Sequence, residues 1–254
     1  MKTRFKNAFR ALAHRNYRLF FVGQGLSLIG TWMQNVALGW LVYRLTNSVF
    51  LLGLVGFSSQ IMVFIFSPLA GVIADRFNRH RVILLTQTLA LSQALLLAVL
   101  VYTNAINVWE IIALSVFLGF VLSFDAPMRQ SFVVEMLDNK QDLGNAIALN
   151  SSVFNGARLV GPAIAGLAIA TLGEGFCFLL NAVSYLAVIV SLLMMRLQHA
   201  PRPKKESKVL QELKEGMAYA YRVPPIRYVI LLLGSISLIG MPYAVLLPVF
   251  ARDI

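Results

Sequence analysis

Long uncharged runs separated by short charged segments dominate the pattern of this chain. The run from Val49 to Ala74 ends at Asp75, and the run from Val82 to Asn107 follows Arg81. A transmembrane helix needs about 20 consecutive apolar residues. The runs are continuous rather than alternating, which favours helices over the strands of a barrel. We therefore predict seven transmembrane helices, at Leu19–Tyr43, Val49–Ala74, Val82–Tyr102, Val108–Phe124, Ile147–Leu172, Phe176–Met195 and Tyr228–Phe250.

Composition supports an all-α membrane protein. Hydrophobic residues make up 58% of the 254 residues and charged residues only 13%, whereas the charged fraction of a soluble domain is about 25%. The net charge of +11 does not indicate nucleic acid, because the basic residues are divided among loops instead of sharing one soluble face. The expected partner is the lipid bilayer.

The distribution of basic residues predicts the orientation of the helices. All but three of the 22 Lys and Arg residues fall before the first predicted span or in the second, fourth and sixth loops; the exceptions are Arg44, Arg158 and Arg252. Cytoplasmic loops carry an excess of Lys and Arg. We therefore expect a multi-pass protein of the plasma (inner) membrane with a cytoplasmic N-terminus.

A polar linker divides the chain into three parts. Residues 1–196 form a predicted six-helix domain, residues 197–225 a cytoplasmic linker, and residues 226–254 the first helix of an incomplete C-terminal domain. Two groups of three helices would be inverted relative to each other, because each group crosses the membrane an odd number of times. Within the linker, apolar residues at helical spacing predict an amphipathic helix on the membrane surface, with a solvated connector as the alternative; they are Val209, Leu210, Leu213, Met217 and Ala220.

A compact basic turn joins the second and third predicted spans, with the sequence Gly71-Val-Ile-Ala-Asp75-Arg76-Phe-Asn-Arg79-His-Arg81. It resembles the signature loop of the major facilitator superfamily, although Asn78 stands where that loop usually has a second glycine. In that family an acidic residue at the end of the fourth helix completes a charge cluster, and Asp125 occupies that place. The resemblance implies a conformational latch formed by Gly71, Asp75, Arg76, Arg79, Arg81 and Asp125; a chance basic turn is the alternative.

Two further motifs resemble one subgroup of that superfamily. The fifth span carries Gly161-Pro162-Ala-Ile-Ala-Gly166, similar to the Gly-Pro pattern of the superfamily's exporters, in which close helix contacts and a missing backbone hydrogen bond suit a helix that must bend. Asp125-Ala-Pro127-Met-Arg129-Gln looks like the subgroup of enterobactin-type siderophore exporters and macrolide-efflux proteins. Carriers of this superfamily have twelve helices, so we expect this chain to be an N-terminal half plus one helix.

Polar residues form stripes on two predicted spans. Gln24, Ser27, Thr31 and Gln34 share one face of the first span, and Ser151, Asn155 and Arg158 share one face of the fifth. Polar side chains at membrane depth face a bundle interior or a watery cavity. For the first stripe, lining of a substrate cavity and plain hydrogen bonding between helices stay open. For the second, Arg158 could attract an anionic or catecholate substrate or pair with an acidic group of the other half of the carrier. Our candidates for cavity lining are Gln24, Thr31, Gln34, Ser151, Asn155 and Arg158.

The sequence offers no catalytic chemistry. His14, His80 and His199 lack the clustering that a metal site needs, and no phosphate-binding Gly-x-x-x-x-Gly-Lys loop is present. We therefore expect neither a metal, a cofactor nor an enzymatic reaction. The resemblance leaves a proton as a candidate coupling ion. Ile111 to Phe124, however, lacks the arginine that proton-coupled drug exporters of that superfamily often carry there, which argues against proton antiport.

These features predict a secondary active transporter that exports small amphipathic, siderophore-like or drug-like compounds by alternating access. Import of a metabolite by the same kind of carrier is the nearest alternative. A transport-incompetent truncated carrier is a second, and a membrane scaffold or intramembrane enzyme a third.

Overall fold

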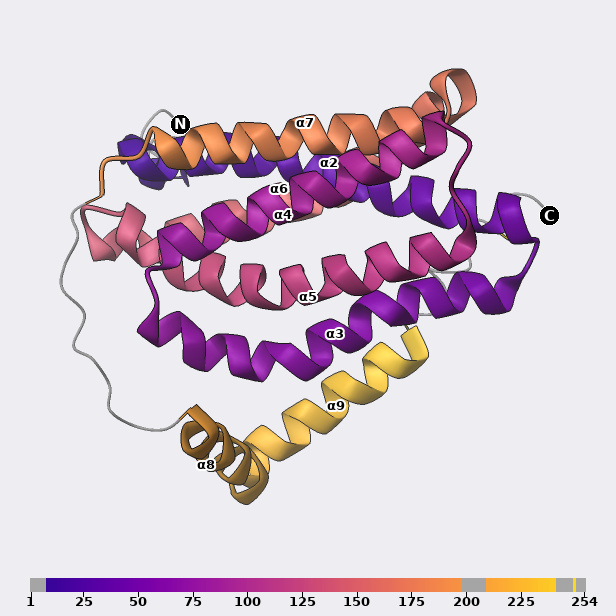
Figure 1. Ribbon diagram of the computed structural model, residues 1–254. Coiled ribbons are helices and arrows are strands. Elements are labelled where there is room, and N and C mark those ends of the chain that lie inside the picture. The colour runs from indigo at the N-terminus through magenta and orange to yellow at the C-terminus, as the bar shows by residue number, and fades with distance from the viewer. Residues whose placement is uncertain (1–7, 198–208, 241–248, 250–254) are drawn as a thin grey trace.

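The computed structural model describes residues 8–197, 209–240 and 249, and within that part the chain is helical without any strand (Figure 1). This confirms the all-α class. The 3-10 helices are η1 (Arg10–Ala13), η2 (Val133–Met136) and η3 (Lys140–Asp142). The α-helices are α2 (Arg15–Thr46), α3 (Val49–Arg76), α4 (Arg79–Tyr102), α5 (Val108–Phe132), α6 (Leu143–Leu172), α7 (Glu174–Leu193), α8 (Val209–Arg222) and α9 (Pro224–Gly240).

Five of these helices are long and apolar enough to cross a membrane, namely α3 to α7. Helix α2 is longer than most of them, with 32 residues, but its polar stripe lowers its hydropathy. Helix α9 has 17 residues, and the rest of the seventh predicted span lies largely among residues 241–248, outside the described part. The total of seven spans therefore stays a prediction.

The predicted end of the fourth span at Phe124 was wrong. Helix α5 continues to Phe132, so Asp125 lies inside the helix rather than at its end, and only 1% of its surface is exposed. The helix continues past this charge because Thr86 and Gln87 donate hydrogen bonds to the carboxylate, at 2.7 and 2.9 Å, and Arg129 pairs with it one turn later. An ionised group inside a bundle persists when it is paired and hydrogen-bonded.

The six helices α2 to α7 pack in a pattern that fits two inverted groups of three. Helix α3 packs on α5, and in the same way α6 packs on α2. Helix α2 packs on α7, and in the same way α5 packs on α4. Helices α4 and α7 pack on each other. Exchanging α2, α3 and α4 for α5, α6 and α7 maps each of these pairs onto another of the set. This is the relation expected from inverted repeats.

Small residues allow the closest helix contacts. A Cβ atom added to Gly23 would lie 2.5 Å from Oγ of Ser191, and one added to Gly30 would lie 2.6 Å from Oγ of Ser184, so α2 and α7 run antiparallel in close contact. A Cβ at Gly119 would overlap the backbone of α3 at Ser59. Interfaces between transmembrane helices favour small residues for this reason.

Among the five helices that are long and apolar enough to cross a membrane, α3 and α6 are the least covered. In the most apolar stretch of each span, 17% of α3 and 22% of α6 is buried, against 44% of α4, 44% of α5 and 39% of α7. Helices α3 and α6 occupy equivalent places in the two groups of three. The six-helix bundle therefore has a packed interior and two helices with uncovered faces.

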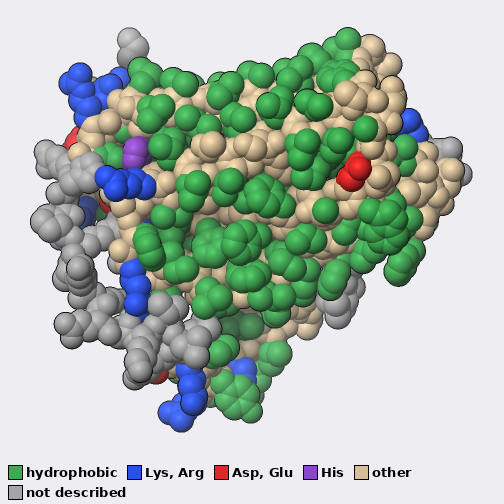
Figure 2. All heavy atoms as spheres, viewed as in Figure 1, with side chains coloured by type: hydrophobic (Ala, Val, Ile, Leu, Met, Phe, Trp, Pro, Cys, Tyr) green, Lys and Arg blue, Asp and Glu red, His purple; other side chains and the backbone are tan. Residues whose placement is uncertain are grey.

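The surface separates into an apolar middle and a basic end (Figure 2). Lys and Arg side chains gather on the left of that view, where η1, the α3–α4 turn and the segment of η2 and η3 meet. We call this the basic end. The opposite end carries an ion pair between Arg44 at the end of α2 and Glu174 at the start of α7, with Nε and Oε1 2.7 Å apart.

Candidate functional site

The basic turn is held by hydrogen bonds at the basic end. Helix α3 ends at Arg76, and the side chain of Asn78 caps α4 by accepting from the backbone N–H of Arg81. The guanidinium of Arg79 donates to the carbonyl oxygen of Ala74 at 3.1 Å. Arg79 therefore fixes the start of α4 to the last turns of α3.

Arg79 also joins the turn to the last turn of α5 and to η2. Its Nη1 donates to the carbonyl oxygen of Ser131 at 3.0 Å and to Oε1 of Glu135 at 2.9 Å. The structure thus brings Arg79 to Glu135, whereas it places Asp125 with Arg129. The side chain of Asp75 lies outside the described residues. The latch stays a prediction, with Glu135 as an additional member that sequence reasoning missed.

Gly71 of the basic turn makes no close helix contact within the described part of the chain. Among described residues, nothing lies within 4 Å of a Cβ placed on Gly71. The close approaches of α3 are instead made at Gly119 of α5. Position 71 is exposed, and a role for Gly71 in the latch stays a prediction.

The Gly-Pro motif of α6 divides into two different environments. A Cβ at Gly161 would lie 2.5 Å from the Cβ of Trp32 and 3.1 Å from the carbonyl oxygen of Ile29, so this glycine seats α6 against α2. Gly166 has no described neighbour within 4 Å. Pro162 lies inside α6, which continues through it. A bending role for the motif stays a prediction.

The polar stripe of α2 turns largely into the bundle. Gln34 is 2% exposed, donates to Oε1 of Gln93 at 3.1 Å, and accepts from Nδ2 of Asn181 at 2.8 Å. This connects α2, α4 and α7 at membrane depth. For Gln34 the structure therefore favours hydrogen bonding between helices, the alternative to cavity lining. Its partners Gln93 and Asn181 were missed, although each is an isolated amide in an apolar run.

The other two cavity candidates on that stripe are placed differently. Thr31 is half-buried and donates to the carbonyl oxygen of Ser27 one turn earlier, at 2.9 Å. Gln24 is 8% exposed, and its Oε1 is buried without a hydrogen-bond partner among described residues. A buried amide oxygen with no partner is costly. Cavity lining stays a prediction for both residues.

The polar stripe of α6 lies on an uncovered face. Ser151, Asn155 and Arg158 are all exposed. The guanidinium of Arg158 lies over the indole of Trp32 in α2, with its Cζ atom 5.7 Å from the ring centroid. The ring of Phe154 meets the same indole edge-to-face at 6.0 Å. The face thus combines one cation, two aromatic rings and hydrogen-bonding groups, a set that can attract an anionic or aromatic molecule.

Metal chemistry finds no support in the described part of the chain. No group of three or more His, Cys, Asp or Glu side chains there is arranged to hold a metal ion.

Comparisons with known proteins find a matching family model and several relatives. A family model described as transmembrane secretion effector matches residues 6–254. The staphyloferrin A transporter of Staphylococcus aureus is 26% identical over 238 residues, which cover 93% of this chain and 59% of that protein. Macrolide efflux protein A of Streptococcus pyogenes is 20% identical over 252 residues, covering 94% of this chain and 60% of that protein.

A third relative is the enterobactin exporter EntS of Shigella boydii, which is 24% identical over 236 residues, covering 89% of this chain and 52% of that protein. The chain spans between about half and three-fifths of the length of these curated relatives.

Proposed function

Since this chain belongs to the transmembrane secretion effector family of the major facilitator superfamily, we propose that it serves in a secondary active transporter that exports small amphipathic compounds by alternating access. The protein is a multi-pass membrane protein. Its place in the plasma (inner) membrane with a cytoplasmic N-terminus is part of the proposal, supported by the gathering of Lys and Arg at the basic end.

The exposed polar face of α6 is the observation that carries this function. An arginine at the centre of a transmembrane helix costs about 2.5–3.5 kcal/mol when it must be inserted into lipid. Arg158, with Ser151 and Asn155 on the same stripe, is exposed on one of the two least covered of the five candidate membrane spans. A water-filled substrate pathway along α6 would remove this cost and would place the cation and the two rings where a passing solute meets them.

The names of the relatives support the same class of substrate. They are a transporter of staphyloferrin A, an exporter of enterobactin and an efflux protein for macrolides. We propose that this chain acts on siderophore-like or drug-like molecules, and the guanidinium of Arg158 favours those that carry negative charge.

We also propose that the basic turn acts as the latch of the conformational cycle. Arg79 bonds to α3, to α5 and to the segment after α5 at once. A movement of α3 relative to α5 would have to break these bonds. The latch would comprise Gly71, Asp75, Arg76, Arg79, Arg81 and Asp125, with Glu135 added from the structure.

Efflux and uptake of a fluorescent amphipathic anion, measured in cells expressing this chain, test the proposal. A form extended to the length of the curated relatives by the downstream coding sequence runs in parallel. Efflux that depends on Arg158 in either form supports the proposal. Net uptake would instead support the importer, and a correctly inserted extended form that moves nothing would contradict transport.

The extended form also separates a working chain from a transport-incompetent fragment. Activity in the extended form alone would mean that the fold described above supplies one half of the carrier. No enzymatic reaction and no cofactor belong to the proposal. A proton as coupling ion is tested in the same assay by collapsing the proton gradient, which stops efflux only if the two fluxes are coupled.

A further inference from the structure

The residues before α2 are docked against the segment that joins α5 to α6. The backbone N–H of Ala11 donates to Oδ1 of Asn145 at 2.9 Å, and Nδ2 of Asn145 returns a bond to the carbonyl oxygen of Ala8 at 2.8 Å. Farther along, the hydroxyl of Tyr17 donates to the carbonyl oxygen of Ala146 at 2.9 Å. These uncharged contacts tie the start of α2 to the start of α6.

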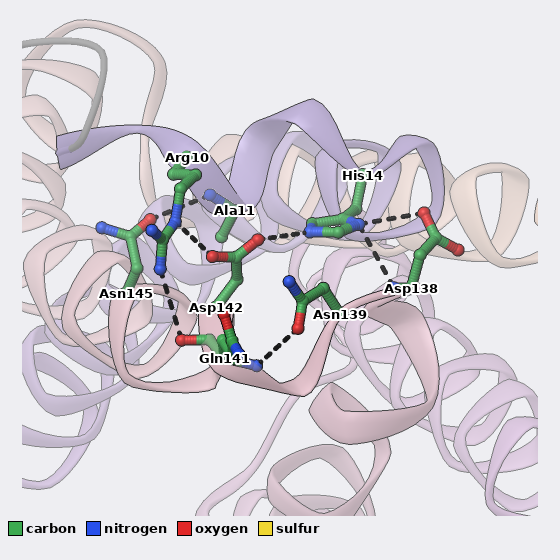
Figure 3. Close-up of polar contacts among 8 residues, drawn as sticks. All are labelled: Arg10, Ala11, His14, Asp138, Asn139, Gln141, Asp142 and Asn145. Atoms are coloured by element: carbon green, nitrogen blue, oxygen red, sulfur yellow. Dashed lines mark hydrogen bonds and ion pairs between the residues drawn. The ribbon is translucent and has the colours of Figure 1, made fainter. Parts of the chain in front are cut away.

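His14 adds an ionic contact at the centre of this docked segment (Figure 3). Its ring lies between two carboxylates, with Nδ1 2.9 Å from Oδ2 of Asp138 and Nε2 2.8 Å from Oδ2 of Asp142. Arg10 pairs with the other oxygen of Asp142. The side chain of Asp142 is almost buried, whereas that of Asp138 is 84% exposed.

The proton content of the ring decides which of these bonds exist. A neutral imidazole has one N–H and can donate to one carboxylate only, whereas an imidazolium donates to both. The backbone N–H of Asp138 lies 3.2 Å from Nδ1 and can donate to it when the ring is neutral. Loss of the Nδ1 proton therefore exchanges a charge-assisted bond for a weaker neutral bond.

We propose that His14 is a proton-sensitive clamp that ties the basic ends of α2 and α6 together when it is charged and weakens that tie when it loses its proton. The clamp is formed by Arg10, His14, Asp138 and Asp142. It joins helices from the two groups of three, and these same helices carry Trp32 and Arg158. This inference does not depend on the proposed transport function.

The sign of the pH effect follows from the direction of the shift. The hydrogen bond with Asp138, followed by that with Asp142, raises the pKa of His14 above its ordinary value against the opposing effect of burial. The clamp is therefore complete at about pH 5.5 to 6.5, where the carboxylates are still ionised, and it weakens as pH rises through the raised pKa of His14. The surrounding elements carry further charged side chains, which are Arg15, Arg18, Glu135, Lys140 and Arg196. Glu135 forms an ion pair with Arg79. The four cations are exposed, so water screens their effect on His14.

Spin labels on the two sides of the clamp test this inference. The chain with Cys177→Ala, reconstituted in lipid nanodiscs, carries labels at Ala13→Cys and Lys140→Cys, both exposed positions. We expect dipolar broadening of the EPR spectrum at about pH 5.5 that decreases toward about pH 9, with a midpoint above the ordinary histidine value.

Four variants should differ in how the broadening depends on pH. His14→Arg keeps the charge and should retain broadening at every pH, whereas His14→Gln should lack the transition and Asp138→Asn should move its midpoint downward. His80→Gln is the matched control, because His80 bonds to the carbonyl oxygen of Leu192, and it should behave as the parent.

The inference is overturned by broadening that does not depend on pH in the parent, or by a transition that survives in His14→Gln. Nitrogen NMR of the histidines in the unlabelled chain provides a second measurement if a labelled variant does not fold. A titration midpoint for His14 at or below the ordinary value would overturn the inference equally.

Discussion

The packed interior of the bundle and the uncovered face of α6 use similar polar residues for different purposes. In the interior, the amides of Gln34, Gln93 and Asn181 satisfy one another across α2, α4 and α7. On the face of α6, Asn155 bonds back to the carbonyl oxygen of Ser151 on its own helix, and Arg158 reaches over Trp32. The interior amides connect helices, whereas the polar side chains of α6 are exposed on its surface.

This difference shows that a polar stripe at membrane depth can either hold helices together or form an exposed polar surface. In the interior, changes should affect stability first, because partners are left without hydrogen bonds. On the uncovered face, changes should affect transport while stability stays nearly constant. The first three predictions below set one region against the other, and the fourth compares the interior with an end of the bundle.

The largest effect is expected for a methyl group added at the closest helix contact. Gly119→Ala places a Cβ into the backbone of Ser59 and should lower the free energy of unfolding by about 2 kcal/mol. Gly156→Ala is the control on α6, since it has no described neighbour within 4 Å. Reversible unfolding in mixed micelles measures both, and equal effects would remove the distinction between the two regions.

The buried amides should give the next largest effect. Gln34→Leu leaves Oε1 of Gln93 and Nδ2 of Asn181 without a partner and should cost about 1–2 kcal/mol, near the upper end of values for hydrogen bonds between membrane helices. Asn155→Leu should change unfolding by less than about 0.5 kcal/mol. If both variants unfold like the parent, Gln34 is available for the cavity lining that its sequence position suggested.

Arg158 should show the opposite profile. Arg158→Gln removes the cation that would attract an anionic substrate and should lower efflux of that substrate about fivefold, a loss of about 1 kcal/mol. The free energy of unfolding should fall by about 0.5 kcal/mol, because only the exposed contact with Trp32 is lost. Arg158→Lys keeps the charge without the planar guanidinium, and its efflux should lie between that of the parent and that of Arg158→Gln. A loss of stability without any change in efflux would assign Arg158 to helix packing.

The smallest effect is expected at the end opposite the basic end. Arg44 pairs with Glu174, but half of the arginine side chain is exposed. Arg44→Gln should therefore cost about 0.2–1 kcal/mol, and less at high salt. Unfolding at two salt concentrations measures this, and a larger cost would mean that ion pairs at the bundle ends rival the interior contacts.

The sequence predicted the bounds of the helices better than it predicted which groups each helix contacts. The runs from Val49 to Ala74 and from Val82 to Tyr102 become α3 and α4 almost residue for residue. The fourth span was placed too short because a charge at Asp125 reads as an end in a linear sequence. The bonds that keep this charge inside α5 come from α4 and from the next turn of α5.

For the candidate residues as well, the sequence did not reveal which side chains are buried and which are exposed. Gln34 and Arg158 both lie on polar stripes with helical spacing, yet one is 2% exposed and the other lies on an open face. The clamp was not predicted, because His14 and Asp142 lie 128 positions apart in the chain. No local pattern marks such a pair.

The sequence by itself determined the membrane-spanning helical class, the boundaries of most helices and the gathering of charge at one end. These properties follow from apolar length and from the position of Lys and Arg along the chain, both of which are local. Only the tertiary structure decided which polar side chains meet partners and which are left exposed. That choice depends on how helices distant in the chain pack, since a hydrogen bond or an ion pair forms only where both groups come within about 3 Å of each other.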